Sequence, residues 1–383
     1  MNRALGLAAL AFGVAVAMPA VAQRNASVYP FPECPAGYPT TADMLDELVD
    51  NGPSAAGDVW ITPSSIQRNN LITGIHQMLN SPQTARIRLQ NAGMDICLAK
   101  SSSSAPSADT YVVYDPDGLS AATSVGLPVL LYRPATTAAN PNQPLVVLSI
   151  PHAKTEGHLA DYFTVEAMNW RHPVSNEPIV RAAVVSTAHR CHANTALDPN
   201  GPSADYIGSV TVSGCNGKMR LSDDAHNAES LLQAMHQELR RQFWDDMIVQ
   251  VHGSGSDFPG ISVSNGSSDQ YNGPEDDSAH AVVGWFRTLG ELYEHMDDLT
   301  VCHQYTLGVD EIRNADYFGV NGRKCGTRNA TRGEDPRLPI DAAPIDPDDR
   351  RYHFLHLEVN SGLKDTQAER ALIIETLEST LGD

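Results

Sequence analysis

The sequence predicts an α/β fold in which helices cover both faces of a mixed, largely parallel sheet. Apolar, β-branched segments with the length of buried strands recur along the chain, at 111–114, 129–132, 145–150, 181–187, 247–251 and 353–359. Segments with helical periodicity alternate with the later strands, at 222–243, 278–296 and 366–381. Such alternation favours a sheet that binds ligands at the carboxyl ends of its parallel strands.

We expect three parts along the chain: a signal peptide over residues 1–22, an N-terminal accessory segment over 23–110 and a main domain over 111–383, which contains the candidate site residues named below. The accessory segment has helical periodicity at 42–49 and 66–79, and a Ser-rich link follows it. It shows no residues with evident chemistry. It is either a layer packed beside the domain or a propeptide.

The first residues indicate export. Asn2 and Arg3 make a short positive start, an apolar run extends to Met18, and a small-residue cleavage pattern ends at Ala22. The apolar run is short for a helix that spans a membrane. We therefore expect a periplasmic or secreted protein.

The six cysteines suggest three disulfides, because an even number in an exported chain is typical of a disulfide framework. Fifteen pairings of six cysteines are possible. We expect the sequential one: Cys34–Cys97, Cys191–Cys215 and Cys302–Cys325. None of these cysteines forms a CxxC pattern, so a zinc-thiolate or redox motif is not indicated.

The net charge restricts the partners. A chain with a net charge of −20 is repelled by the phosphates of nucleic acid, and it has no excess of positive charge that would bind an anionic membrane surface. A local basic stretch over 313–337 is either a solvated loop or a contact for an acidic substrate. We expect a small-molecule or peptide substrate.

Histidines and a glutamate stand at strand ends in a pattern typical of a metal site. His152 follows the strand 145–150 immediately after Pro151, Glu156 comes four residues later, and His252 ends the strand that begins at Met247. A catalytic zinc usually takes three protein ligands and keeps one position open. The sequence therefore predicts a Zn²⁺ site made by His152, Glu156 and His252, with His158 as an alternative to Glu156.

Glu358 is the candidate general base. It stands between Leu357 and Val359 in an apolar strand, where a glutamate is rare unless it is paired or functional. Zinc makes water acidic enough to deprotonate near neutral pH. A carboxylate beside the metal can accept that proton and pass it to the leaving amine.

These motifs together resemble those of the zinc carboxypeptidase superfamily, over roughly residues 140–380. That superfamily includes N-formylglutamate amidohydrolase-like and succinylglutamate desuccinylase-like enzymes. The matching features are Pro-His-(x)3-Glu after a strand, Val-His-Gly at the end of a second and Leu-Glu-Val within a late one. The resemblance implies a carboxypeptidase-like fold, zinc ligands at His152, Glu156 and His252, and a catalytic Glu358.

The same resemblance gives a role to Arg190, which lies in a segment similar to the family's Asn-Arg segment. Arg190 would bind a substrate carboxylate or polarise the scissile carbonyl. The chain departs from carboxypeptidases proper in two ways: its first ligands are spaced HxxxE instead of HxxE, and His189 stands where the family often has asparagine.

The sequence thus predicts an exported zinc-dependent hydrolase of an amide bond, either a carboxypeptidase or an N-acyl amino-acid deacylase. Two alternatives stay open. A serine esterase on an α/β-hydrolase fold would fit the histidine-rich α/β chain, although no G-x-S-x-G motif is present. A non-catalytic binding protein could keep the same fold.

Overall fold

The computed structural model describes residues 31–38, 40–55, 60, 62–99, 109–134, 145–156, 163–171, 178–201, 215–243, 246–254, 261–264, 299–301, 354–360 and 367–381. These residues belong to one compact unit, Phe31–Asp383. Several predicted features lie outside the described residues: the signal peptide 1–22, His158, the helix 278–296, the pair Cys302–Cys325 and the basic stretch 313–337.

Within the described residues the strands form a nine-stranded mixed sheet in the order β1-β2-β3-β5-β4-β6-β9-β7-β8. Neighbouring strands in the middle, β5-β4-β6-β9, are all parallel, whereas β1, β2 and β3 pair antiparallel and β7 runs antiparallel to β9. The strands are β1 (Asp95–Ala99), β2 (Thr110–Tyr114), β3 (Val129–Tyr132), β4 (Val146–Ile150), β5 (Val180–Val185), β6 (Met247–Ser254), β7 (Ile261–Ser264), β8 (Leu299–Val301) and β9 (Phe354–Asn360).

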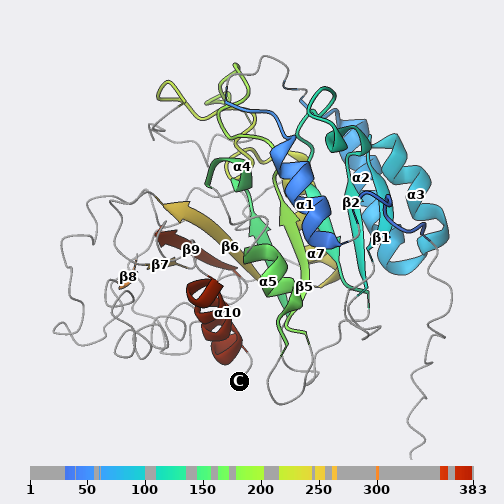
Figure 1. The fold of residues 1–383 in the computed structure, drawn as a ribbon. Helices are drawn as coiled ribbons and strands as arrows, with labels where there is room; N and C mark the ends of the chain where they lie inside the picture. Colours follow the sequence, from blue (N-terminus) through green and yellow to red (C-terminus); the bar gives the residue numbers. More distant parts are fainter. Residues whose placement is uncertain are drawn as a thin grey trace, which may run out of the picture. The chain divides into compact units, whose positions relative to one another are not determined.

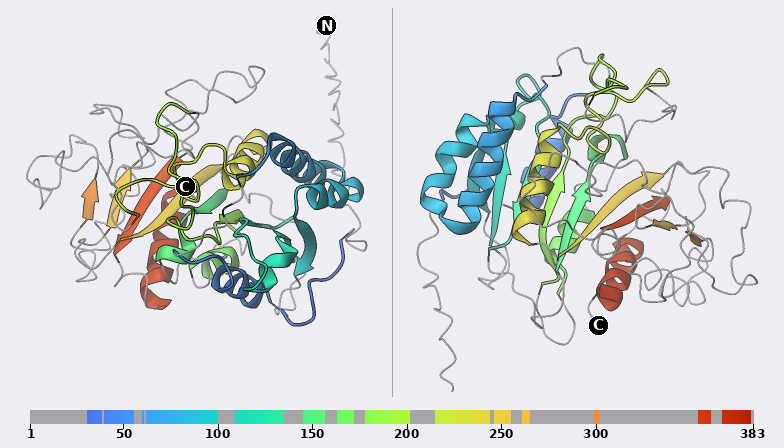
Figure 2. Two further views of the ribbon diagram at one scale, coloured as in Figure 1. Left: turned by 90° about the horizontal axis from the view of Figure 1, so that it is seen from above. Right: turned by 180° about the vertical axis from the view of Figure 1, so that it is seen from behind.

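Helices cover both faces of this sheet, as predicted (Figure 1, Figure 2). One face carries α1 (Thr41–Asp50), α5 (Thr164–Asn169) and α10 (Gln367–Leu381), and the other carries α2 (Ser65–Asn80), α3 (Pro82–Asn91) and α7 (Leu231–Gln242). Two further helical elements are short: the 3-10 helix η2 (Pro116–Leu119), between β2 and β3, and the one-turn helix α4 (Ala153–Glu156), after β4. The predicted α/β class is therefore confirmed.

Residues 31–99 are built into the sheet. Strand β1 pairs along its whole length with β2, from Asp95 opposite Tyr114 to Ala99 opposite Thr110. Helices α2 and α3 pack together, and α2 also packs against α7. The predicted disulfide Cys34–Cys97 ties the first residues of this segment to β1.

Helix α7 begins later than the sequence predicted. The pattern predicts a start near Ser222, but Ser230 is the N-cap, with the Gln233 N–H donating to the Ser230 hydroxyl. The reason is that Ser222 is committed elsewhere: its hydroxyl accepts the Ala193 N–H and donates to the Arg190 carbonyl. Residues 222–230 therefore form turns that run into the site described below.

The two sides of β6 and β9 differ in chemistry because side chains alternate along a strand. Val249, Val251, Leu355 and Leu357 belong to the core cluster that also contains α1, α5 and α10. The alternate positions are polar, and the register pairs Gln250 with His356 and His252 with Glu358. A polar ladder thus lies on the α7 face of the sheet.

The structure also contains the predicted disulfide Cys191–Cys215. Two bonded pairs, Cys34–Cys97 and this one, indicate an oxidising environment. Among the described residues, no helix has both the length and the apolar character needed to cross a membrane.

Candidate metal centre

The topology brings His152 and His252 to one edge of the sheet. Strands β4 and β6 are parallel neighbours, with Ser149 opposite Gln250, so both carboxyl ends point the same way. His152 stands two residues after the last residue of β4, and His252 lies near the end of β6. This is the edge at which open α/β sheets bind ligands.

Helix α4 adds Glu156 to this pair. Its single turn carries the chain from His152 to Glu156, and the Glu156 N–H donates to the His152 carbonyl at 2.9 Å. A spacing of four residues places both side chains on one side of the turn. The HxxxE spacing, which departs from that of carboxypeptidases proper, is therefore suited to this local helix.

The three side chains converge on a small volume. His152 Nδ1 lies 2.9 Å from Glu156 Oε1 and 3.1 Å from His252 Nδ1, and His252 Nδ1 lies 3.4 Å from Glu156 Oε1. Ligand atoms of a tetrahedral zinc with bonds of about 2.0–2.1 Å lie about 3.4 Å apart. The three side chains are at most 7% exposed. Their donor types and separations fit one divalent cation.

The outer nitrogen of each histidine is held by a second residue. His152 Nε2 lies 2.9 Å from Asp223 Oδ1, and the His252 Nε2–H donates to Gln250 Oε1 at 2.9 Å. Metal-binding histidines usually make such a bond with the nitrogen that does not bind the metal. Both imidazoles are therefore oriented with Nδ1 inward.

The electrostatics of the site favour a positive charge at this point. Burial opposes protonation of His152, but Glu156 and Asp223 on either side outweigh it and raise the pKa of the imidazole to about 9. Burial likewise acts to raise the pKa of the Glu156 carboxyl, but His252 and His152 hold it well below its usual range. The Gly253 N–H also donates to Glu156 Oε2 at 2.8 Å.

Glu358 lies beside these residues on the next strand. It is the register partner of His252, and because paired residues of neighbouring strands share a face, both side chains are on the α7 side of the sheet. Its side chain is 15% exposed, and Glu358 Oε1 is 3.8 Å from His356 Nε2. The His356 ring in turn lies 4.9 Å from the His252 ring.

Arg190 reaches the same place from the loop after β5. Its Nη1 is 4.0 Å from Glu156 Oε1, and its backbone N–H donates to Thr155 Oγ1 at 3.3 Å. The Nε atom is buried and has no hydrogen-bond partner within the described part of the chain. The structure thus brings together all five residues that the sequence singled out: His152, Glu156, Arg190, His252 and Glu358.

The solved structures to which this chain has a distant likeness include the following two. A metallo-carboxypeptidase from Burkholderia cenocepacia is 12% identical with a TM-score of 0.30, over 66% of this chain and 59% of that one. N-formylglutamate amidohydrolase from Ralstonia eutropha JMP134 is 11% identical with a TM-score of 0.31, over 67% of this chain and 96% of that one.

A metallo-carboxypeptidase and an N-formylglutamate amidohydrolase are also the kinds of enzyme named in the sequence resemblance. This chain covers a little over half of the carboxypeptidase. No family model matches the chain, and no curated protein matches it. Because the likeness is distant, the geometry of the site decides what the chain can do.

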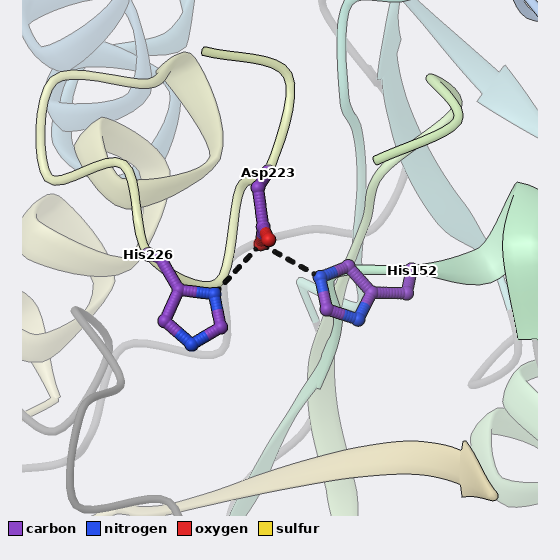
Figure 3. A group of neighbouring side chains, drawn as sticks. All are labelled: His152, Asp223 and His226. Atoms are coloured by element: carbon purple, nitrogen blue, oxygen red, sulfur yellow. Dashed lines mark hydrogen bonds and ion pairs between the residues drawn. The ribbon is translucent and has the colours of Figure 1, made fainter. Parts of the chain in front are cut away.

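The structure adds two residues that the sequence reading missed. Asp223 Oδ1 is 2.9 Å from His152 Nε2 and 2.9 Å from His226 Nδ1, so one carboxylate joins two imidazoles (Figure 3). Burial acts to raise the pKa of the Asp223 carboxyl, but His226 and His152 hold it far below its usual range. The DxxH spacing of Asp223 and His226 is the available signal, but the same residues also fit the start of a helix.

These residues form a second group with the geometry of a metal site, made by His152, Asp223 and His226. It shares His152 with the first group but uses the opposite ring nitrogen. In the first group, Asp223 is the carboxylate that orients a ligand. In the second group, Asp223 is itself a ligand and Glu156 would orient His152.

A serine–histidine pair also exists near the site, but a substrate cannot reach it. Ser149 Oγ lies 2.9 Å from His236 Nε2, within the range of an activated serine. Ser149 is 0% exposed and His236 is 3% exposed. This pair therefore gives no support to the serine esterase alternative.

Proposed function

We propose that the protein is an exported, zinc-dependent hydrolase that cleaves an amide bond, as a carboxypeptidase or an N-acyl amino-acid deacylase does. The observation that carries this proposal is the convergence of His152 Nδ1, Glu156 Oε1 and His252 Nδ1 at the carboxyl ends of β4 and β6. Two imidazoles and one carboxylate are a usual ligand set of a catalytic zinc.

His152, Glu156 and His252 would hold the metal. When bound, zinc would supply a Lewis acid that polarises a carbonyl oxygen and lowers the pKa of water toward neutrality. We favour His152 Nδ1 over Nε2 as the ligand atom because three neighbouring groups support the first set. Gln250 orients His252, Asp223 orients His152, and the Gly253 N–H fixes Glu156.

Glu358 would act as general base and then as general acid. Its side chain is partly exposed, so a substrate at the strand ends can reach it, and it lies next to the ligand His252 in the register of β6 and β9. A carboxylate in this place can accept a proton from water and deliver it to the departing amine nitrogen.

Arg190 would bind a negative group of the substrate. Its buried Nε lacks a partner among the described residues, and a buried donor without a partner is costly unless a ligand satisfies it. A guanidinium can hold a carboxylate through two parallel hydrogen bonds or stabilise a developing oxyanion. The substrate would therefore be a small molecule or peptide with a carboxylate near the scissile amide.

Export and the choice of partners belong to the same proposal. The two disulfides and the signal-like first residues support a periplasmic or secreted location. The net charge of −20 argues against nucleic acid and an anionic membrane surface as partners.

The first experiment is to measure metal content by elemental mass spectrometry on the wild type and two histidine variants, after supplying zinc and washing away the excess. We expect about one zinc per chain in the wild type, loss of zinc in His252→Ala and retention in His226→Ala. The reverse pattern would assign the metal to His152, Asp223 and His226. A wild type that binds no zinc would overturn the proposal. Circular dichroism on each variant shows whether it is folded.

The second experiment tests the reaction. N-acyl amino acids and peptides with a free C-terminus are incubated with the zinc-loaded protein, and amine release is measured. We expect hydrolysis that a chelator stops and zinc restores. Hydrolysis that a chelator leaves unchanged, but that a serine-reactive phosphonate abolishes, would contradict the proposal in favour of a serine esterase.

A further inference from the structure

Three buried polar side chains lie in series behind His252. The Gln250 side chain accepts from the His252 Nε2–H at 2.9 Å and donates through Nε2 to Ser149 Oγ at 3.3 Å. Ser149 Oγ is 2.9 Å from His236 Nε2. The series crosses from β6 to β4 and then to α7, so three separate elements hold it.

This series is fully enclosed. Gln250 and Ser149 are each 0% exposed, and His236 is 3% exposed. Burial lowers the pKa of His236 to about 3, so its imidazole is neutral. Burying polar groups is unfavourable unless they are hydrogen-bonded, and apolar groups of the same shape can take the place of a hydrogen-bonded pair at little cost in stability. Apolar residues do fill the alternate positions of the same strands, for example Leu148 and Val249.

The direction of the Gln250 amide determines which nitrogen of His252 carries the proton. A neutral imidazole has one N–H and one lone pair. With the Gln250 oxygen toward His252, the proton is on Nε2, and the Nδ1 lone pair points at His152 and Glu156. With the amide reversed, the Gln250 N–H would donate to Nε2, and Nδ1 would carry a proton that blocks metal binding.

We propose that Gln250, anchored through Ser149 and His236, is a positioning residue that fixes His252 as the Nε2–H tautomer and so prepares Nδ1 to bind the metal. This inference rests on the proposed function, because it needs His252 to be a ligand. The inference goes beyond the proposed function because it gives a role to Gln250, Ser149 and His236, which lie outside the ligand set. Gln250 acts through His252 and does not touch the substrate.

The test compares two replacements of Gln250. In Gln250→Met the side chain keeps its length but cannot accept a hydrogen bond, and in Gln250→Glu it still accepts one. Two quantities are measured on each folded variant: the zinc dissociation constant, by competition with a chromophoric chelator, and the tautomer of His252 in the metal-free protein, by ¹⁵N NMR.

We expect Gln250→Met to weaken zinc binding by about 10- to 100-fold, the usual effect of losing such a partner. Its His252 should become a mixture of tautomers. Gln250→Glu should keep wild-type affinity or exceed it. Ser149→Ala removes the anchor but keeps the amide, so it should weaken zinc binding less than Gln250→Met does. It also keeps the inference testable if the Gln250 variants fail to fold.

The matched control is Gln67→Met on α2. The Gln67 amide donates to the Ala92 carbonyl at 2.9 Å and has no part in the series. This variant should lose some stability while its zinc affinity stays at the wild-type value.

The outcomes separate the two proposals. A wild type without zinc means that the proposed function fails. A wild type that binds zinc, with the same affinity and the same His252 tautomer in Gln250→Met, means that only the positioning role fails. An equal loss of affinity in Gln250→Met and Gln67→Met would also overturn that role, since it would indicate a general effect of destabilisation.

Discussion

The Nδ1 atoms of His152 and His252 lie 3.1 Å apart, with each imidazole held from behind through its Nε2 atom. Gln250 keeps the proton of His252 on Nε2, so only His152 can place a proton between the two nitrogens. A cation that binds there must displace that proton.

Zinc affinity should rise with pH. The pKa of His152 is about 9, so below that value metal and proton compete for the same nitrogen. The apparent dissociation constant should fall about tenfold for each pH unit between pH 6.5 and 9. Chelator competition across this range measures it. An affinity that stays constant from pH 6.5 to 9 would contradict the role of His152 Nδ1.

The metal-free protein should lose stability over the same range. The pKa of His152 is raised on folding from the ordinary 6.5, so its contribution is complete below pH 6.5 and is lost as the pH rises through about 9. The full loss is on the order of 3 kcal/mol. Urea unfolding of chelator-treated protein at pH 6 and pH 9 measures it, and His152→Ala should remove the difference.

Glu358→Gln should abolish turnover and keep the metal. The amide cannot accept a proton from water, and general acid–base catalysis typically contributes about 10²- to 10⁴-fold to a rate. Steady-state kinetics and metal content are measured together. Glu375→Gln, an exposed glutamate on α10, is the matched control and should leave both unchanged. A Glu358→Gln protein with full activity would exclude the proposed general base.

Asp223→Asn should weaken zinc binding by about 10- to 100-fold, since the carboxylate that orients His152 loses its charge. The neighbouring variant Asp224→Asn is the control. Asp224 is also buried, but its Oδ2 accepts from the Ser186 hydroxyl instead of a histidine, and burial raises its pKa to about 6. Equal zinc affinities in the two variants would mean that Asp223 has no special part in the site.

The disulfide Cys191–Cys215 should matter for activity as well as for stability. It holds the residue after Arg190, and its removal by a double alanine substitution should destabilise the protein by about 2–4 kcal/mol. Turnover should fall with zinc retained, because Arg190 loses its support. The double variant at Cys34 and Cys97 should lose stability alone. Equal effects on activity from both double variants would contradict this assignment.

The sequence predicted the central strands and the five candidate site residues because their signals are local. A strand such as β4 is buried on both faces, so it reads as a nearly continuous apolar run in which Ser149 is the one polar residue, and His152 follows two residues after its end. Glu358 stands out because its neighbours in the strand are apolar. The motifs that carry the family resemblance are equally short and local.

Other features could not be read in this way. Strand β1 and helix α3 carry weaker patterns, and pairing with β2 and packing against α2 define them. Residues 222–230 look like the first turns of a helix, yet the hydroxyl of Ser222 and the carboxylate of Asp223 are bound to partners far away in the chain.

The sequence by itself determined the α/β class, the identity of the ligand candidates and the glutamate beside them, because periodicity and residue type are properties of short segments. Only the tertiary structure decided which nitrogen of each histidine faces inward. That choice depends on two residues. Asp223, in the turns before α7, binds His152, and Gln250, on β6, binds His252. Hydrogen-bond partners brought together by folding, and not the local sequence, fix the proton on an imidazole.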